Sequence, residues 1–208
     1  MFVKNIITIA KKYKFSLPKI LFYEIFFILR GFKGNKISFA INDEFSANIP
    51  CPYYFLIKIR KFLSNKQIKS FIDLGCGNGR VIFFFNRYFK IKYYGVEFFK
   101  KPFNYCKTIF SRDQNIQIEN EDFRNLNFLK KDIDCYFFNE PLKNKKEFEL
   151  VISSIYQKYN NDVYRKYYII LVNVQRDDLN LVSNLNLHDF ETINTRGYYI
   201  YSNGEKVK

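Results

Sequence analysis

The 208-residue sequence contains no tryptophan, a single histidine (His188) and only four cysteines. The cysteines are Cys51, Cys76, Cys106 and Cys135, and no two of them form a CxxC pair. This spacing excludes a zinc knuckle and a redox-active dithiol, and no cluster of metal ligands is visible. We therefore expect no metal site, and four buried thiols in a reducing compartment.

Long hydrophobic runs are also missing. The most apolar segment, Ile20–Leu29, contains Glu24 and is too short to cross a bilayer core of about 30 Å. A second apolar stretch, Ile6–Ala10, is followed by Lys11 and Lys12 rather than by the small-residue cleavage site of a signal peptide. We expect a cytoplasmic protein without an integral membrane segment.

The composition itself is that of a globular protein, with 48% hydrophobic and 26% charged residues. Thirty-four Lys and Arg against 20 Asp and Glu give a net charge of +14, which attracts nucleic acid, anionic membranes and acidic substrates. However, the abundance of Phe, Tyr, Lys, Asn and Ile is typical of an AT-rich coding sequence. A solvated basic surface is therefore favoured over a nucleic-acid face.

The first 48 residues are expected to form a helical extension, and residues 49–208 the main domain. Ser16-Leu17-Pro18 should open a helix that runs to Arg30 and stops at Gly31, the usual asymmetry of helix caps. Apolar residues fall on nearly all sides of this helix, which suits packing on the main domain or a membrane surface, and packing is favoured. The two prolines of Ile49–Tyr54 predict a rigid lead-in to a helix over 55–63.

From Lys69 onward, short β-branched and aromatic runs alternate with helical patterns, which is typical of a parallel sheet flanked by helices. Only Arg196 and Gly197 separate the last two expected strands, so these should form an antiparallel hairpin. The prediction is a three-layer, Rossmann-like α/β fold with seven mostly parallel strands. The expected strands are 70–74, 93–96, 116–118, 135–139, 167–174, 190–195 and 198–202. The expected helices are 80–89, 102–111, 146–159 and 177–185, with a weak turn over 125–131.

The most informative segment is the glycine loop Gly75–Gly79, which joins a buried strand ending at Asp73-Leu74 to a helix. Its three alternating glycines permit a tight turn and close approach to a ligand, and the helix N-terminus offers free N–H donors. A dinucleotide fingerprint would place its third glycine at Arg80, so a pyrophosphate cradle is disfavoured.

Two acidic segments follow at the ends of the next strands. Glu97 ends the second strand, where a carboxylate can accept hydrogen bonds from both hydroxyls of a ribose. After the third strand, Glu121-Asp122-Phe123 offers a carboxylate for an adenine amino group and an aromatic ring to cover the base. Together with the glycine loop, they predict a nucleoside pocket.

These three segments resemble the S-adenosylmethionine-binding motifs of class I (Rossmann-like) methyltransferases, and the resemblance covers roughly residues 50–203. It implies S-adenosyl-L-methionine as the cofactor, with the glycine loop behind the methionine part, Glu97 on the ribose and Asp122 at the adenine. Asp73 would support the loop or the cofactor amino group. The cofactor-binding residues implied are Asp73, Gly75, Cys76, Gly77, Gly79, Glu97, Asp122, Phe123 and Asn139.

The resemblance also implies a site for the methyl acceptor at the end of the fourth strand, where this chain has Asn139-Glu140-Pro141-Leu142. It resembles the Asn/Asp-Pro-Pro-aromatic motif of amino methyltransferases and, more closely, a Phe-Asn-Pro-Phe variant of small bacterial methyltransferases. Glu140 is interposed, and Leu142 replaces the aromatic that would stack on a nucleobase. The catalytic candidates are Asn139, which would align an amine, and Glu140, which would remove a proton or anchor a cationic lysine. A helix-capping or solvated Glu140 is an equal alternative.

The leading interpretation is a methyltransferase that N-methylates a protein side chain or a small metabolite. RNA or DNA methylation is the alternative suggested by the net charge, and a cofactor-binding module with a decayed acceptor site is another. A membrane-peripheral role ranks last. His188 is expected to be a surface histidine in a polar loop, and Tyr53 and Tyr54 either reach the cofactor or belong to the core.

Overall fold

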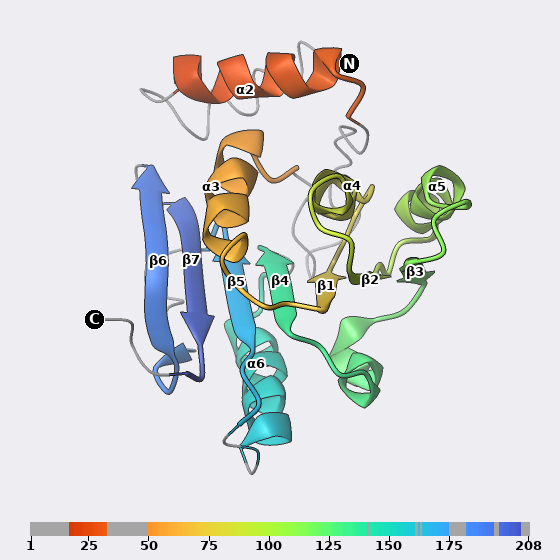
Figure 1. Ribbon diagram of the computed structural model, residues 1–208. Coiled ribbons are helices and arrows are strands. Elements are labelled where there is room, and N and C mark those ends of the chain that lie inside the picture. Colours follow the sequence, from red (N-terminus) through yellow and green to blue (C-terminus); the bar gives the residue numbers. More distant parts are fainter. Residues whose placement is uncertain are drawn as a thin grey trace.

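The computed structural model describes residues 17–32, 50–140, 142–160, 162, 164–174, 182–193 and 196–204. A seven-stranded sheet lies at the centre of the molecule, between helices on both of its faces (Figure 1). Its strands are β1 (Ser70–Leu74), β2 (Lys92–Val96), β3 (Ile116–Glu119), β4 (Cys135–Asn139), β5 (Tyr168–Val172), β6 (Asn186–Ile193) and β7 (Arg196–Ser202).

The strand order is β3-β2-β1-β4-β5-β7-β6. The first five strands are parallel, whereas β7 runs antiparallel to both β5 and β6. Every residue of β1 is buried, as expected of a central strand covered on both faces. The predicted Rossmann-like α/β fold with a C-terminal antiparallel hairpin is confirmed.

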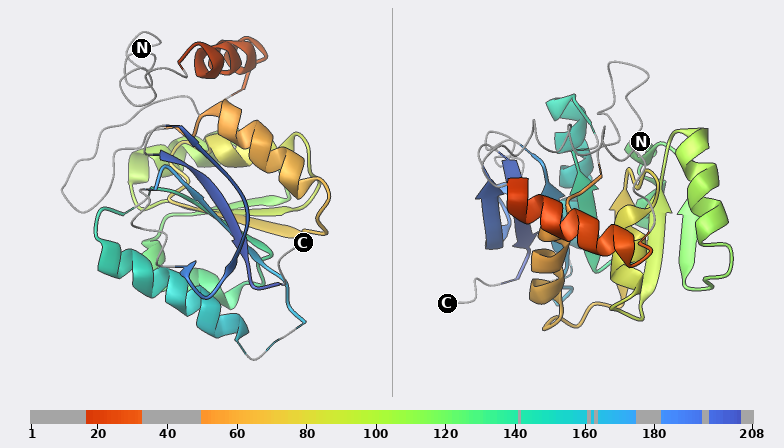
Figure 2. Two further views of the ribbon diagram at one scale, coloured as in Figure 1. Left: turned by 90° about the vertical axis from the view of Figure 1, so that its left-hand side faces the viewer. Right: turned by 90° about the horizontal axis from the view of Figure 1, so that it is seen from above.

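Two hydrophobic clusters fill the space between the sheet and its helices, one on each face. The first joins the sheet to α2 (Leu17–Leu29), α3 (Tyr53–Leu63), α4 (Arg80–Asn86) and α5 (Lys100–Ile109). The second lies under α6 (Lys145–Tyr159) and the short 3₁₀ turns η2 (Phe123–Asn125) and η3 (Asn127–Lys130). Figure 2 shows α6 on the side of the sheet opposite α2 and α3.

Helix α2 forms an outer layer over α3 and α4 (Figure 1). It begins at Leu17 and is followed by Gly31 at φ +74°, as the capping pattern predicted. Phe27 is buried and stacks on Tyr53 of α3, with ring centroids 4.7 Å apart. The helix thus packs on the main domain. The predicted division at residue 48 falls outside the described residues and stays a prediction.

A buried ion pair fastens α2 to the rest of the chain. The Glu24 carboxylate pairs with the Arg80 guanidinium, and its other oxygen accepts the Tyr53 backbone N–H at 2.9 Å. Arg80 also lies over the Tyr53 ring, 3.8 Å from the centroid. Breaking such a pair leaves an uncompensated buried charge, so the contact holds α2 firmly.

The C-terminal hairpin differs from the expected one in its bounds. Strand β6 begins at Asn186, and Arg196 and Gly197 belong to β7 rather than to the turn; residues 194–195 lie outside the described residues. The expected helix over 177–185 lies mostly outside them too, and residues 182–185 form a turn. His188 is therefore in a strand, where its Nε2 lies 2.7 Å from Ser202 Oγ. Burial, and then the Lys66 charge, lower its pKa.

All four cysteines are buried free thiols, as predicted. In the part of the chain that the structure describes, no group of three His, Cys, Asp or Glu side chains is placed to hold a metal ion. Over the same residues, no helix is long and apolar enough to cross a bilayer.

Candidate functional site

The register of the parallel strands brings three predicted site residues to one level of the sheet. Leu74 of β1 pairs with Val96 of β2 on one side and with Phe138 of β4 on the other. The next residues along these strands are Gly75, Glu97 and Asn139. Neighbouring strands lie about 4.8 Å apart, so Glu97 and Asn139 flank the glycine loop across roughly 10 Å of the carboxyl edge.

The glycine loop turns back over the end of β2. The N–H groups of Gly75 and Cys76 both donate to the Val96 carbonyl, at 2.9 and 3.0 Å. Gly75 and Gly77 have φ of +84° and +54°, in the left-handed region that side chains disfavour. The loop therefore presents bare backbone at the edge, as a close ligand contact requires.

Glu97 is 6% exposed, and backbone donors hold its carboxylate. The Gly77 N–H donates to Oε2 and the Phe99 N–H to Oε1, both at 2.8 Å. Burial raises its pKa, and these two hydrogen bonds oppose the rise. Each carboxylate oxygen can accept a further hydrogen bond, so this fixed group suits the two adjacent hydroxyls of a ribose.

Asp73 is a second buried carboxyl group behind the loop. Within the described residues its Oδ2 is buried without a hydrogen-bond partner. Burial, and then the neighbouring Glu97 charge, raise the pKa of Asp73 well above its usual value. Two buried carboxyls beside a loop of backbone donors suit a cofactor that carries positive charge and hydroxyl groups, as S-adenosylmethionine does. The residues present therefore fit the cofactor that the motifs imply.

The other predicted loop residues serve packing. A Cβ on Gly79 would lie 2.6 Å from the Phe110 ring and 2.8 Å from Cys106 Sγ, so only glycine fits against α5. Cys76 is buried, and its hydrogen bond with Cys106, followed by burial, raises the pKa of its thiol. Cys106 Sγ lies 3.1 Å from the Gly77 carbonyl. The side chains of Cys76, Cys106 and Phe110 thus pack against the glycine loop and support it.

The end of β3 is arranged differently from the expectation. Asp122 caps the turn η2 and is paired with the Arg124 guanidinium, whose Nη2 lies 2.7 Å from Asp122 Oδ2. Arg124 also reaches Glu147 of α6 at 2.9 Å. An adenine amino group at Asp122 would share the carboxylate with this arginine. Phe123 is buried against Phe138, so its ring belongs to the core.

An aromatic residue that the sequence reasoning missed stands beside Glu97. Phe98 is 44% exposed, directly after the carboxylate on the same loop. The Asn120 side chain donates to the carbonyls of Glu97 and Phe98, both at 2.8 Å, and so fixes the loop. The sequence signal for Phe98 is its position immediately after Glu97, the acidic residue at the end of the strand. Phe98 is thus a second candidate for the cover of the base.

At the other end of the edge, Asn139 has a polar partner from the next strand. Its Oδ1 accepts the Asn173 side-chain N–H at 2.6 Å. Asn173 directly follows β5, is 1% exposed and has φ +61°. This hydrogen bond holds the Asn139 amide in one orientation.

Glu140 is ion-paired with Arg196 of β7, whose Nη1 also donates to the Asn173 carbonyl at 2.9 Å. Its backbone has φ +46°, an unusual conformation for a non-glycine residue. The sequence pattern predicts a turn at Arg196 and does not single out Asn173. The signal for both was weak, because only the tertiary structure brings the ends of β4, β5 and β7 together.

The two tyrosines of the lead-in belong to the core. Tyr53 and Tyr54 are the first residues of α3 and are at most 2% exposed. The Tyr54 hydroxyl donates to Glu191 of β6, and burial, followed by this hydrogen bond, raises its pKa to about 12. Their place under α2 favours the core interpretation over a contact with the cofactor.

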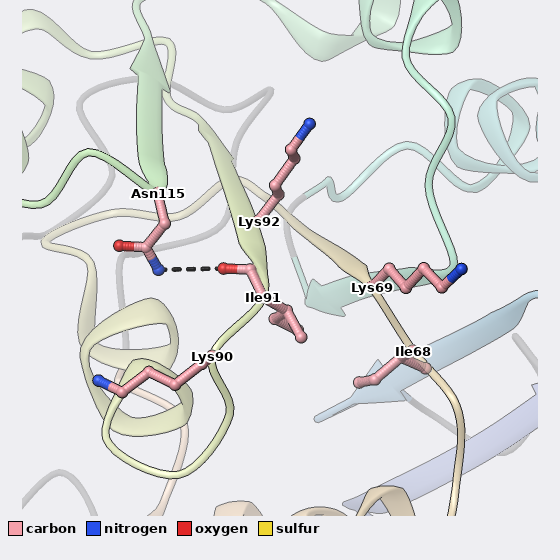
Figure 3. A pocket seen from close by; sticks show the side chains of 6 residues that line it. All are labelled: Ile68, Lys69, Lys90, Ile91, Lys92 and Asn115. Atoms are coloured by element: carbon pink, nitrogen blue, oxygen red, sulfur yellow. Dashed lines mark hydrogen bonds between the residues drawn. The ribbon is translucent and has the colours of Figure 1, made fainter.

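A hollow of about 520 Å³ lies at the opposite edge of the sheet. There β1, β2 and β3 begin, far along each strand from the glycine loop. The lysine side chains at its rim point in different directions, and no carboxylate lines it (Figure 3). It therefore does not match the chemistry of the nucleoside pocket. Its lining residues are Ile68, Lys69, Lys90, Ile91, Lys92 and Asn115.

Comparison of the sequence with protein families gives a match over residues 71–161 to a family described as "Methyltransferase domain". The matched residues run from β1 through α6 and contain the glycine loop, Glu97, Asp122 and Asn139. No match to the sequence is found among curated proteins.

Solved methyltransferase structures share the fold. A putative methyltransferase, yhhF, from Escherichia coli has a TM-score of 0.58 at 13% identity, covering 74% of this chain and 88% of its own. An RNA methyltransferase from Salinibacter ruber, solved with S-adenosyl-L-homocysteine, has a TM-score of 0.56 at 9% identity, covering 77% and 97%. Fibrillarin from Aeropyrum pernix, with natively bound S-adenosyl-L-methionine, has a TM-score of 0.53 at 12% identity, covering 65% and 67%.

Proposed function

We propose that this chain, an S-adenosylmethionine-dependent methyltransferase, N-methylates a protein side chain or a small metabolite held at Asn139. The observation that carries the proposal is the common level of Gly75, Glu97 and Asn139 at the carboxyl edge of β1, β2 and β4. At this level, the backbone of the glycine loop and the Glu97 carboxylate lie on one side, and the Asn139 amide lies on the other.

On the cofactor side, the backbone of Gly75 and Gly77 would line the methionine part and Glu97 would accept the ribose hydroxyls. The cofactor supplies an electrophilic methyl group on a sulfonium. Asp73, with its unpartnered oxygen, would face the positive charge of the ligand. Asp122 would accept the adenine amino group, with Phe98 against the base.

On the acceptor side, Asn139 would orient a planar amine. Its Oδ1 accepts a hydrogen bond from Asn173, which orients the amide, and the same carbonyl oxygen would accept an N–H of the substrate. Holding that N–H directs the nitrogen lone pair toward the methyl group, and alignment of this kind is a large part of catalysis.

Glu140 would help to hold the substrate. Its carboxylate is paired with Arg196, which favours an anchoring role over the removal of a proton. A lysine ammonium would be held beside this carboxylate, and its nitrogen would release a proton to solvent before its lone pair accepts the methyl group. The missing aromatic at Leu142 disfavours stacking of a nucleobase here, and a lysine or a small amine suits the site better.

The test begins with titration calorimetry of S-adenosylhomocysteine on the wild type and on Glu97→Ala. We expect micromolar binding that weakens roughly a hundredfold in the variant, because a buried carboxylate with charge-assisted hydrogen bonds is lost. Glu119→Ala is the matched control, because Glu119 ends the neighbouring strand and pairs with Lys131 at the surface. Absence of binding to the wild type would refute the cofactor site.

The acceptor is then sought by following methyl transfer from labelled cofactor in a screen of proteins, peptides and small amines. Transfer that falls in Asn139→Ala while cofactor affinity stays unchanged would support the assignment. Tight cofactor binding without transfer to any acceptor would instead support the binding module with a decayed acceptor site.

Methylation of RNA or DNA is the second candidate, because the chain carries a net charge of +14. A protein that neutralises several phosphates loses affinity steeply with salt. A gel shift of RNA whose log affinity falls linearly with log salt would favour this candidate, and absence of a shift at low salt would remove it.

A further inference from the structure

One side of α2 is an exposed apolar stripe that faces away from the domain. It is formed by Pro18, Phe22, Ile25 and Leu29, whose spacing of four, three and four residues places them on one face of a helix. Phe22 is 62% exposed, Ile25 41% and Leu29 82%. The stripe carries no polar group.

The opposite side of α2 is fixed to the protein. Ile20, Glu24 and Phe27 are each at most 5% exposed, and Glu24 is tied to Arg80 by the buried ion pair. Because this side is held, the helix cannot roll to bury its stripe. Both figures of the whole molecule show α2 as its outermost layer (Figures 1 and 2).

Positive charge lies near both ends of the stripe. Residues 17–32 and 50–96 contain only two acidic side chains, Glu24 and Asp73, and both are buried. Lys19 and Arg30 are exposed near the two ends of α2, and Arg87 of the adjoining segment reaches the Phe32 ring at 5.0 Å. All exposed charge within these two ranges is therefore positive.

The acidic side chain that approaches this layer from β6 is already neutralised. Glu191 lies 3.4 Å from Lys58 and accepts the Tyr54 hydroxyl. It therefore does not offset the positive charge beside α2.

We propose that α2 docks the protein on an anionic lipid surface, with its apolar stripe inserted at the interface and its basic neighbours against the headgroups. An apolar helix face flanked by lysine and arginine binds membranes in this way. Ile25 and Leu29 are aliphatic and offer neither a ring to stack on bases nor a hydrogen bond, so the stripe fits lipid better than nucleic acid. The proposal is independent of the methyl acceptor.

The docking is peripheral. With 13 residues, α2 is about 20 Å long, shorter than the hydrocarbon core of about 30 Å. Its other face is committed to α3 and α4 through Phe27 and Glu24, so the helix lies in the plane of the surface. One stripe of this size gives reversible binding that depends on lipid charge.

The experiment is flotation of the full chain with vesicles of phosphatidylcholine, with and without phosphatidylserine. We expect the wild type to float with the anionic vesicles only. Phe22→Ser/Leu29→Ser should weaken this binding roughly tenfold or more, because two inserted apolar side chains are lost. The matched control is Leu150→Ser/Phe190→Ser, which changes exposed apolar residues on α6 and β6 and should float like the wild type.

A second variant, Lys19→Glu/Arg30→Glu, keeps the stripe and should lose the preference for anionic vesicles. Circular dichroism and S-adenosylhomocysteine affinity report whether each variant is folded. Absence of flotation by the wild type, or equal flotation by the stripe variant, would overturn the proposal. It would also be overturned if the stripe variant only turned a dimer into a monomer in light scattering, or only abolished RNA binding.

Discussion

The two halves of the carboxyl edge are built in different ways. At β1 and β2, backbone N–H groups of the loops hold the glutamate, and glycines adopt the left-handed conformations. At β4 and β5, side chains hold one another, and the left-handed residues are Glu140 and Asn173. The half at β1 and β2, which we propose binds the cofactor and call the cofactor half, depends on backbone geometry that few substitutions preserve. The half at β4 and β5, the proposed acceptor half, depends on side chains, which can change to suit another substrate.

The difference also concerns strain. A non-glycine residue in the left-handed region costs on the order of 1 kcal/mol, which its surroundings must offset. Asn173 is held by Asn139, by Arg196 and by the Gly197 carbonyl that accepts its N–H at 2.8 Å. Strained polar residues at a strand end are typical of functional sites, whereas the glycines of the other half adopt the same conformation at little cost.

Gly79→Ala should give the largest effect and tests whether the cofactor half is as intolerant as its geometry implies. The new methyl group would press on Phe110 and Cys106 at φ +76°, so we expect a loss of about 3 kcal/mol or more in unfolding by urea. Gly31→Ala is the control, because its φ of +74° is similar but the space around it is open. It should lose only about 1 kcal/mol, and equal losses would show that packing against α5 is unimportant.

Asn173→Ala should have the next largest effect and breaks the acceptor half alone. It removes the hydrogen bond to Asn139 and leaves alanine in the left-handed region, which together destabilise the protein by about 2 kcal/mol in urea unfolding. The S-adenosylhomocysteine affinity should stay unchanged in calorimetry. Asn173→Gly, which relieves the strain but also lacks the hydrogen bond, should recover about half of the loss. A large change in cofactor affinity would show that the two halves are not separable.

Asp73→Asn tests the buried charge of the cofactor half. The pKa of Asp73 is raised in the folded state, so this state keeps a proton that the unfolded chain releases as pH rises above the usual aspartate value. The stability of the folded protein therefore falls as pH rises from the usual aspartate pKa to the raised pKa of Asp73 in the folded state, and it stays low above that pKa. We expect the variant to be more stable than the wild type at slightly alkaline pH, with the difference vanishing as the pH falls below the usual aspartate pKa.

The measurement is thermal unfolding of both proteins across pH. The same variant should bind S-adenosylhomocysteine more weakly, because the charge opposite the ligand's ammonium is gone. A stability difference that does not depend on pH would contradict the assignment of a buried, titrating carboxyl.

Phe98→Ala should have the smallest effect and sharpens the description of the cofactor half. Loss of an aromatic cover over the base costs about 1 kcal/mol, which is roughly a fivefold weaker affinity for S-adenosylhomocysteine in calorimetry. The unfolding free energy should change little, because the ring is 44% exposed. Phe190→Ala, at another exposed phenylalanine, is the control. An unchanged affinity would show that Phe98 does not cover the base.

Much of this protein was determined by its sequence alone. The glycine loop and its flanking strand were predicted with the observed bounds of β1, because a buried hydrophobic strand that ends in alternating glycines is a local pattern. Strand β4 and Gly31 at the end of α2 followed from equally local signals. The level of Glu97 beside the loop was predictable as well, since parallel strands align their carboxyl ends.

Other features were decided only by the tertiary structure. Arg80 follows the glycine loop in sequence, but its side chain turns away to Glu24, 56 residues earlier. Phe123 was expected over a base and is in the core, and Arg196 was expected in a turn and holds Glu140. These contacts join residues far apart in the chain, and their partners depend on how helices and strand ends meet. Local propensity carries the backbone pattern, whereas the pairing of side chains is set by packing that no single segment encodes.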